Sequence, residues 1–269
     1  MNSTASRSAG LSAFQLKIFA LLVMTLDHIA AYVPLPIPGW FHLAGRLAAP
    51  LFLFLCAEGF AHTRSRTRYL GRLYAASVLM QLGNSLMNRF FMVDGGPVII
   101  NGMFSTLFVV VWVLLCGELI RSREPHMTVR GVLGLVLAAL SSLPLLALML
   151  HSAWLAAPAG RALLQIYTIL VPNPLFCEGG VVWVALGVAF YYTRRCSGVR
   201  AAVFALLCAA LAAINHDWLT YLCTFAAVIP MCFYRGEPGK YKLKLFFYLY
   251  YPLHVYVLFF LGWLLHTRY

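Results

Sequence analysis

The sequence predicts an all-α fold, a polytopic integral membrane helical bundle of about nine transmembrane helices with its N-terminus in the cytoplasm. Three observations predict this class. Of the 269 residues, 62% are hydrophobic and only 10% are charged, whereas roughly 25% of the residues in a soluble domain are charged. The apolar residues form runs of about 20, which is the length that crosses a bilayer. Lys and Arg are concentrated in every second connector, as membrane topology requires.

Nine apolar stretches are candidate spans, and we expect them to form one transmembrane domain over residues 1–269. Residues 1–13 are expected to be a short cytoplasmic tail. The first apolar run is too long for a signal peptide and has no small-residue cleavage site after it, so we interpret it as a retained span. In order, the expected spans cover residues 14–33, 43–62, 70–92, 98–120, 130–150, 178–193, 199–215, 218–234 and 243–265.

The charge of the connectors predicts the orientation. Five alternate connectors, starting with the N-terminal one, hold sixteen Lys and Arg residues, and the connectors between them hold three. Cytoplasmic loops carry an excess of Lys and Arg, so the N-terminus is expected inside and the C-terminus outside. Residues 151–177 contain three prolines and are expected to form an outer-face loop or an amphipathic segment. A tenth span within residues 151–177 would place the basic connector that follows span 178–193 outside the cell membrane, against the charge rule.

Charge and cysteine content exclude other classes of protein. The net charge of +12 is explained by the basic connectors, and no soluble basic surface remains that could bind nucleic acid. The seven cysteines include no CxxC pair and mostly lie in apolar runs, as small buried residues do. The eight histidines include no pair at i and i+4, so we expect no metal site.

Polar residues inside the expected spans are the candidate functional residues, because a charge at bilayer depth costs at least ~2.5–3.5 kcal/mol. The first span carries Asp27 and His28, and the second carries Arg46 and Glu58. Asp27 or Glu58 could form an ion pair with Arg46, and Asp27 is the better match because it falls at a similar depth in the outer half. Glu58 falls near the cytoplasmic end. Further polar positions are Asn101 in the fourth span and Tyr251 and His254 in the last.

Lys17 and His28 are eleven residues apart on the first span, which corresponds to about 16 Å and three helical turns. Both side chains are therefore expected on one helix face, Lys17 at the cytoplasmic edge and His28 deep in the membrane. This arrangement suits a ligand with an anionic head and a reactive end. The alternative is structural, since a lone intramembrane histidine commonly bonds two helices and Lys17 could simply flank the span.

Five segments, in order along the chain, resemble a known family. They are LKIFALLVMTLDHIA, GRLAAPLFLFLCAEGFAHTRSRTRYLGRL, INGMFSTLFVVV, EGGVVWVALGVAFYY and YRGEPGKYKLKLFFYLYYPLHVYVLFFLG. They resemble the TraX family of bacterial membrane acetyltransferases, whose named member acetylates the N-terminus of a conjugative pilin. The first two are also similar to the wider acyltransferase-3 superfamily, through a basic residue ten residues before a histidine and an Arg-led Pro-Leu-Phe span.

The resemblance implies a multi-pass enzyme of the bacterial inner membrane that takes an acetyl group from cytoplasmic acetyl-CoA and passes it to an acceptor amine, the N-terminus of a pilin. His28 is the candidate catalytic base, with Asp27 or Arg46 fixing its environment, and an acetyl-histidine intermediate is the alternative route. The basic cytoplasmic face would attract the anionic donor. Candidate donor-binding residues are Lys17, Arg46, Glu58, Arg64 and Arg72, and candidates for orienting the acceptor or the thioester carbonyl are Asn101, Tyr251 and His254.

Three other functions stay open at this point. One is an O-acetyltransferase that acts on a cell-surface glycan or a lipid-linked sugar. Another is a proton-coupled transporter, which would use intramembrane Asp, His, Arg and Glu equally well; however, we find no inverted repeat and no matching pair of broken spans. The last is a non-catalytic assembly protein, which would have little need for Lys17 and His28 on one helix face.

Overall fold

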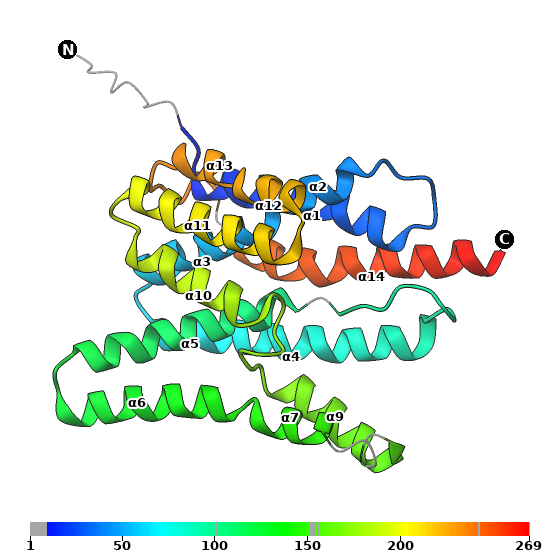
Figure 1. Ribbon diagram of the computed structural model, residues 1–269, viewed down its shortest axis with the longest axis horizontal. Coiled ribbons are helices and arrows are strands. Elements are labelled where there is room, and N and C mark those ends of the chain that lie inside the picture. The colour runs from blue at the N-terminus through cyan, green and yellow to red at the C-terminus, as the bar shows by residue number, and fades with distance from the viewer. Residues whose placement is uncertain (1–9, 101, 151–153, 155, 242, 269) are drawn as a thin grey trace.

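The computed structural model describes residues 10–100, 102–150, 154, 156–241 and 243–268 (Figure 1). The fold is all-α, as the sequence predicts, and the described residues contain no β-strand. One isolated parallel bridge joins Leu11 to Tyr234. The Leu11 N–H donates to the Phe233 carbonyl at 2.7 Å, which ties the start of the first helix to the last connector.

Each predicted span coincides with one helix or with two consecutive helices, and a further helix, α9, lies within residues 151–177. The helices are α1 (Ala13–Tyr32), α2 (Trp40–Gly45), α3 (Ala48–His62), α4 (Arg66–Phe91), α5 (Met103–Arg121), α6 (Pro125–Leu140), α7 (Leu143–Leu150), α9 (Pro158–Leu170), α10 (Gly180–Tyr192), α11 (Ser197–Asn215), α12 (Trp218–Phe225), α13 (Val228–Cys232) and α14 (Lys244–Arg268).

Among the residues that the structure describes, six helical stretches are long and apolar enough to cross a membrane, so the chain is a membrane protein. Two shorter apolar stretches, Gly180–Tyr192 and Trp218–Cys232, coincide with two more of the predicted spans. Helix α4 has 26 residues but begins in the Arg-rich connector. The number of nine spans and the cytoplasmic N-terminus stay predictions. The six stretches are Ala13–Tyr32, Trp40–His62, Met103–Arg121, Pro125–Leu150, Ser197–Asn215 and Lys244–Thr267.

Local sequence signals explain where helices begin and break. Ser12 and Gln15 form a capping box at the start of α1, in which the Gln15 N–H donates to Ser12 Oγ at 3.3 Å and the Ser12 N–H donates to Gln15 Oε1 at 2.9 Å. Pro50 lacks the N–H that would bond to the Arg46 carbonyl, so α2 and α3 separate just before it. Pro230 separates α12 from α13 in the same way.

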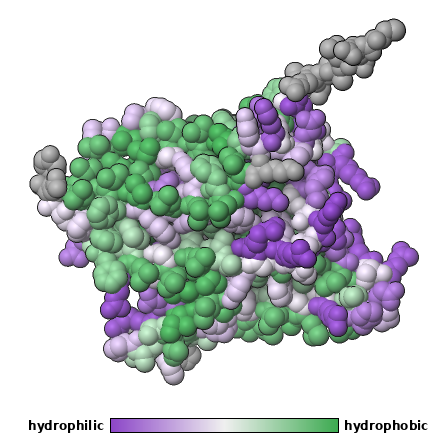
Figure 2. All heavy atoms as spheres, turned by 180° about the vertical axis from the view of Figure 1, so that it is seen from behind, coloured by the Kyte–Doolittle hydropathy of each residue, from purple (hydrophilic) through white to green (hydrophobic). Residues whose placement is uncertain are grey.

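The connections between helices place the basic residues at one end of the bundle. The connections α3–α4, α5–α6, α10–α11 and α13–α14 lie at the left of Figure 1, and the C-terminus lies at the right. Figure 2, seen from behind, shows hydrophilic side chains gathered at the corresponding right-hand end, while much of the rest of that face is hydrophobic. We call this end the basic end; it carries Arg64, Arg66, Arg121, Arg123, Arg194, Arg195, Arg235 and Lys240.

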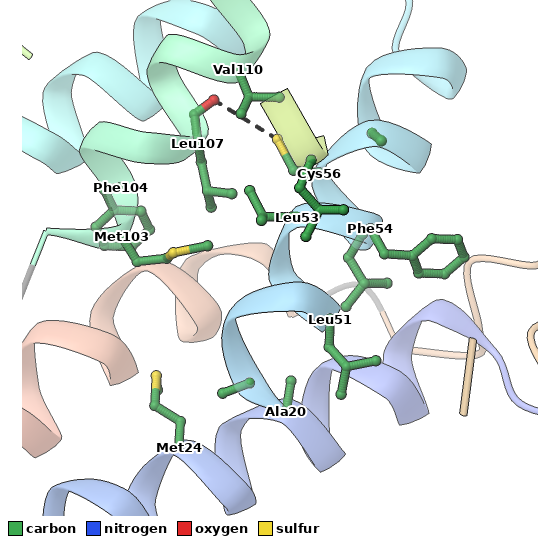
Figure 3. Packing of buried hydrophobic residues seen from close by; sticks show 14 of the residues in the cluster. Ala20, Met24, Leu51, Leu53, Phe54, Cys56, Met103, Phe104, Leu107 and Val110 are labelled. Carbon is green, nitrogen blue, oxygen red and sulfur yellow. Dashed lines mark hydrogen bonds between the residues drawn. The ribbon is translucent and has the colours of Figure 1, made fainter. Parts of the chain in front are cut away.

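The core lies where α1, α3, α5 and α10 meet. Figure 3 shows α3, with Leu51 and Leu53, between α1, which carries Ala20 and Met24, and α5 on the opposite side. A Cβ at Gly187 of α10 would lie 2.8 Å from a methyl group of Val110, so the small residue lets the helices approach closely. Such packing is the main source of stability between helices in a bilayer, where lipid tails are as apolar as leucine.

Helices α6, α7 and α9 lie along one side of the bundle (Figure 1). Gly131 is the buried residue of α6, while Leu133 and Leu137 are about 60% exposed, as suits a lipid-facing helix. The Tyr167 hydroxyl of α9 donates to the Ser141 carbonyl at 2.7 Å, and the Tyr74 hydroxyl of α4 donates to the Leu170 carbonyl at 3.0 Å. These two hydrogen bonds tie the C-terminal part of α9 to the α6–α7 connection and to α4.

Candidate functional site

A cavity of about 420 Å³ lies in the half of the bundle away from the basic end. Its walls come from the later part of α1 and α11, the start of α3, α5, α10 and α12, and the middle of α14. These segments bring residues from nearly the whole chain together. The polar side chains on the walls are Asp27, His28, Arg46, Glu178, Thr220, Tyr221, Thr224 and Tyr251, and the largest apolar ones are Met24, Phe52, Met103 and Trp183.

A chain of hydrogen bonds fixes the imidazole of His28. His28 Nδ1 lies 2.8 Å from His254 Nε2, and His254 Nδ1 lies 2.8 Å from the carbonyl oxygen of Tyr250. The carbonyl can only accept, so His254 carries its proton on Nδ1. With both imidazoles uncharged, His254 Nε2 accepts from His28 Nδ1. The lone pair of His28 is then on Nε2, which is the form that a base or a nucleophile requires.

Aromatic rings of α14 pack around this histidine pair. The ring of Tyr251 stacks on His28, with centroids 6.3 Å apart and planes at 23°, and the ring of Tyr250 stacks on His254 at 5.0 Å. The Tyr250 hydroxyl lies 2.9 Å from Thr25 Oγ1 on α1. His28, Tyr251 and His254 are all buried. The pair is therefore held on both sides and has little freedom to rotate.

Asp27 forms the ion pair that the sequence predicts. Its Oδ1 lies 3.7 Å from the Arg46 guanidinium and accepts a closer hydrogen bond, at 2.8 Å, from His42 Nδ1. The absence of a side chain at Gly45 makes this approach possible, since a Cβ there would collide with the Cβ and Cγ of Asp27. Arg46 and His42 are partly exposed and hold Asp27 at the cavity wall.

Glu178 is the second carboxylate on the cavity wall. Its Oε2 accepts from the Gly102 N–H at 2.8 Å and from the Tyr251 hydroxyl at 3.3 Å, and its own carbonyl accepts from Thr106 Oγ1 at 2.7 Å. It therefore joins the start of α10 to the start of α5 and to α14. The Tyr251 hydroxyl also lies 3.4 Å from the Met103 N–H. Tyr251 consequently connects Glu178 to the ring of His28.

The candidate donor-binding residues, apart from Arg46, lie toward the basic end. The ammonium of Lys17 is 5.3 Å from the centroid of the Phe247 ring on α14. Lys17 and His28 both contact α14, as expected for residues on one face of α1. Glu58 Oε2 lies 3.9 Å from His62 Nδ1. Arg72 lies 5.8 Å from the Tyr69 ring, and Arg64 is exposed in the α3–α4 connection.

The structure thus brings together part of the candidate set. His28, Asp27, Arg46 and Tyr251 line the cavity and His254 bonds to His28, whereas Lys17, Glu58, Arg64 and Arg72 do not line it. Asn101 lies outside the described residues. Sequence reasoning missed His42, assigned to a connector, and Glu178, at the edge of an expected span. The feature of the sequence that could have indicated them is an ionisable residue directly before an apolar run.

Within the described ranges, no group of three or more His, Cys, Asp or Glu side chains could hold a metal ion. The His28–His254 contact and the Asp27–His42 contact are direct hydrogen bonds between side chains. The cavity wall instead places a guanidinium together with an oriented imidazole and two carboxylates, which are groups that can take up or release a proton.

Comparison with known proteins adds two findings. A family model described as TraX protein matches residues 12–262. Over 270 residues the chain is 29% identical to a protein of Dichelobacter nodosus named as probable fimbrial assembly protein FimC, serogroup H1, and the match covers 93% of this chain and 95% of that relative. No solved structure matches the chain.

Proposed function

Since the chain belongs to the TraX family, we propose that it is a membrane-embedded acetyltransferase that moves an acetyl group from cytoplasmic acetyl-CoA to an acceptor amine, the N-terminus of a pilin. The family and the fimbrial assembly name of the relative both fit a role connected with pili. We place the enzyme in the bacterial inner membrane, with the basic end in the cytoplasm, because Lys and Arg favour that side.

The observation that carries the proposal is the fixed tautomer of His28 at the cavity wall. His28 Nε2 takes a proton from the acceptor amine as the nitrogen attacks the thioester carbonyl. The new N–C bond forms and the C–S bond breaks. The proton then passes from His28 to the leaving thiolate, which departs as CoA, so His28 ends in its starting form.

The path of the donor follows from the positions of Lys17 and His28 on one face of α1. The eleven residues between them correspond to about 16 Å along the helix. The phosphates of CoA would bind near Lys17, Arg64 and Arg72 at the basic end, where positive potential concentrates an anionic donor. The thin pantetheine arm would then extend between α1 and α14 toward the cavity.

Substitution of His28 tests the catalytic assignment. Purified protein in lipid nanodiscs is incubated with labelled acetyl-CoA and a peptide that has a free N-terminal amine. Loss of the base in His28→Ala is expected to reduce acetyl transfer by about 10³-fold. The matched control is His126→Ala, at an exposed position near the start of α6. Transfer that survives in His28→Ala would remove His28 from the mechanism. Absence of transfer in the unaltered protein would refute the proposal that it is an acetyltransferase.

Two further measurements define the reaction. Rapid acid quenching followed by mass spectrometry distinguishes direct transfer, which leaves His28 unmodified, from an acetyl-histidine intermediate, which adds an acetyl group to it. The acceptor is identified by mass spectrometry of surface pilins and glycans from cells with and without the gene. Loss of acetyl groups from glycans, with pilins unchanged, would replace the amine acceptor by a hydroxyl acceptor.

A further inference from the structure

We infer that Glu178 selects the acceptor by binding its protonated amine in the cavity before transfer. This inference rests on the proposed function and names the chemical class of acceptor that the same cavity takes, a primary ammonium group next to an apolar residue. Glu178 would act as a specificity-determining residue, distinct from the base at His28.

The first argument is the difference between the two carboxylates on the wall. Asp27 is neutralised by His42 at 2.8 Å and by Arg46 at 3.7 Å. Glu178 has no Lys, Arg or His nitrogen within 4 Å among the residues that the structure describes. A carboxylate at membrane depth is costly unless a cation or several donors compensate it. The Glu178 carboxylate is therefore suited to bind a positively charged group of the substrate in the cavity.

The second argument is the character of the surrounding wall. The rings of Phe52, Trp183, Tyr221 and Tyr251 line the same cavity as Glu178. Aromatic faces attract an ammonium group, and the attraction grows as water is excluded. Met24, Val182 and Leu211 add apolar surface that suits the side chain beside the amine. A carboxylate among aromatic rings is a typical site for an organic ammonium ion.

The third argument is the position of Glu178 relative to the base. Tyr251 donates to Glu178 Oε2 and stacks on His28, so one aromatic ring lies between the carboxylate and the imidazole. An ammonium group bound at Glu178 shares the cavity with His28. It first releases one proton to water and becomes the neutral amine, and His28 removes a second proton as the nitrogen attacks the thioester. A neutral hydroxyl would also donate a hydrogen bond to the carboxylate, but it would lack the attraction between opposite charges that an ammonium group adds.

The structural alternative is that Glu178 only caps α5, because its Oε2 accepts the Gly102 N–H at 2.8 Å and a carboxylate at a helix N-terminus is favourable. The substitution Glu178→Gln separates the two roles. Glutamine keeps an oxygen that accepts from Gly102 and Tyr251, so the cap persists, but the negative charge is removed.

The experiment measures binding in the absence of acetyl-CoA. The probes are three Gly-Leu-Leu peptides with a C-terminal fluorophore, which carry a free amine, a hydroxyl in its place (glycolyl), or an acetylated amine. Fluorescence anisotropy with the full-length protein in nanodiscs gives each Kd. We expect the amine peptide to bind about tenfold more tightly than the glycolyl peptide, because only the ammonium group forms an ion pair with Glu178. That ratio should fall to about 1 in Glu178→Gln and recover in part in Glu178→Asp.

The control is Glu124→Gln, the same change at an exposed carboxyl at the start of α6, which should keep the wild-type ratio. Equal binding of the amine and glycolyl peptides by the unaltered protein, or a preference that persists in Glu178→Gln, would overturn the inference. A Glu178-dependent preference without acetyl transfer would refute the proposed function alone. Transfer whose amine preference is insensitive to Glu178→Gln would refute the inference alone.

Discussion

Two networks of charged and aromatic side chains lie in opposite halves of the bundle. Near the basic end, Glu118 of α5 accepts from Tyr191 at 2.6 Å and pairs with Arg66 at 3.2 Å. In the other half, His28, His254 and Tyr251 join Asp27 and Glu178 around the cavity. None of the residues of the Glu118 network lines that cavity.

The two networks differ in how they use their charge. In the Glu118 network each carboxylate oxygen has its own partner, and the Arg66 guanidinium also lies over the Phe60 ring at 4.9 Å. Charge and hydrogen bonding are complete without a ligand, which indicates a structural role. In the cavity network, His28 and Glu178 both line the cavity, and the Glu178 carboxylate accepts hydrogen bonds but has no Lys, Arg or His nitrogen within 4 Å among the described residues. In a membrane protein, ionisable groups that line a cavity at membrane depth are candidates for a functional role.

Among the substitutions that test the comparison of the two networks, we expect the largest change in kcat at His254, a positioning residue that acts through His28. His254→Leu removes the acceptor for His28 Nδ1–H, so the imidazole can turn or change tautomer. We expect kcat to fall by about 10²-fold with an unchanged KM for acetyl-CoA, because orientation of the base is lost while donor binding is not.

Partial rescue by His254→Gln distinguishes positioning from packing. The glutamine carbonyl oxygen can take the place of Nε2 and accept from His28, whereas leucine only fills the volume. Similar kcat values for the leucine and glutamine variants would show that the contact is not needed for orientation, and kcat within twofold of the wild type would remove His254 from the mechanism.

The next effect should appear in the Glu118 network, as a loss of stability and not of catalysis. Glu118→Ala leaves the Tyr191 hydroxyl and Arg66 without their partner, which should cost about 1–3 kcal/mol because both are partly buried. Thermal unfolding of the detergent-solubilised protein measures the fall in Tm. The kcat of the remaining folded protein should not change.

A double variant checks the cause. Glu118→Leu with Arg66→Leu removes both charges, so it should be more stable than Glu118→Ala. If the folded Glu118→Ala protein lost as much kcat as the cavity variants do, the division between a structural and a functional network would be contradicted.

How much of this could be predicted from the sequence differs between fold and site. Runs of apolar residues predicted nine helical stretches, and each coincides with helix, because hydrophobicity is a local signal. Asp27 and Arg46 were paired through their expected depths. The bond between His28 and His254 joins residues 226 positions apart, and no local pattern specifies it. Glu178 was not predicted as a site residue because it is the first residue of the expected span 178–193, directly after the irregular stretch 151–177.

The smallest effect is expected at Gly45, and it tests whether the position of Asp27 matters. An added Cβ would collide with Asp27, so Gly45→Ala must shift α2 away from α1 or rotate the carboxylate away from His42. We expect kcat to fall about fivefold, the equivalent of about 1 kcal/mol in the barrier. Gly71→Ala on α4 is the matched control, since nothing lies within 4 Å of its Cβ position, and alanine there favours the helix by about 1 kcal/mol. If Gly45→Ala and Gly71→Ala have the same kcat, the position of Asp27 does not affect catalysis and Asp27 only joins α1 to α2. The functional network would then be confined to His28, His254, Tyr251 and Glu178.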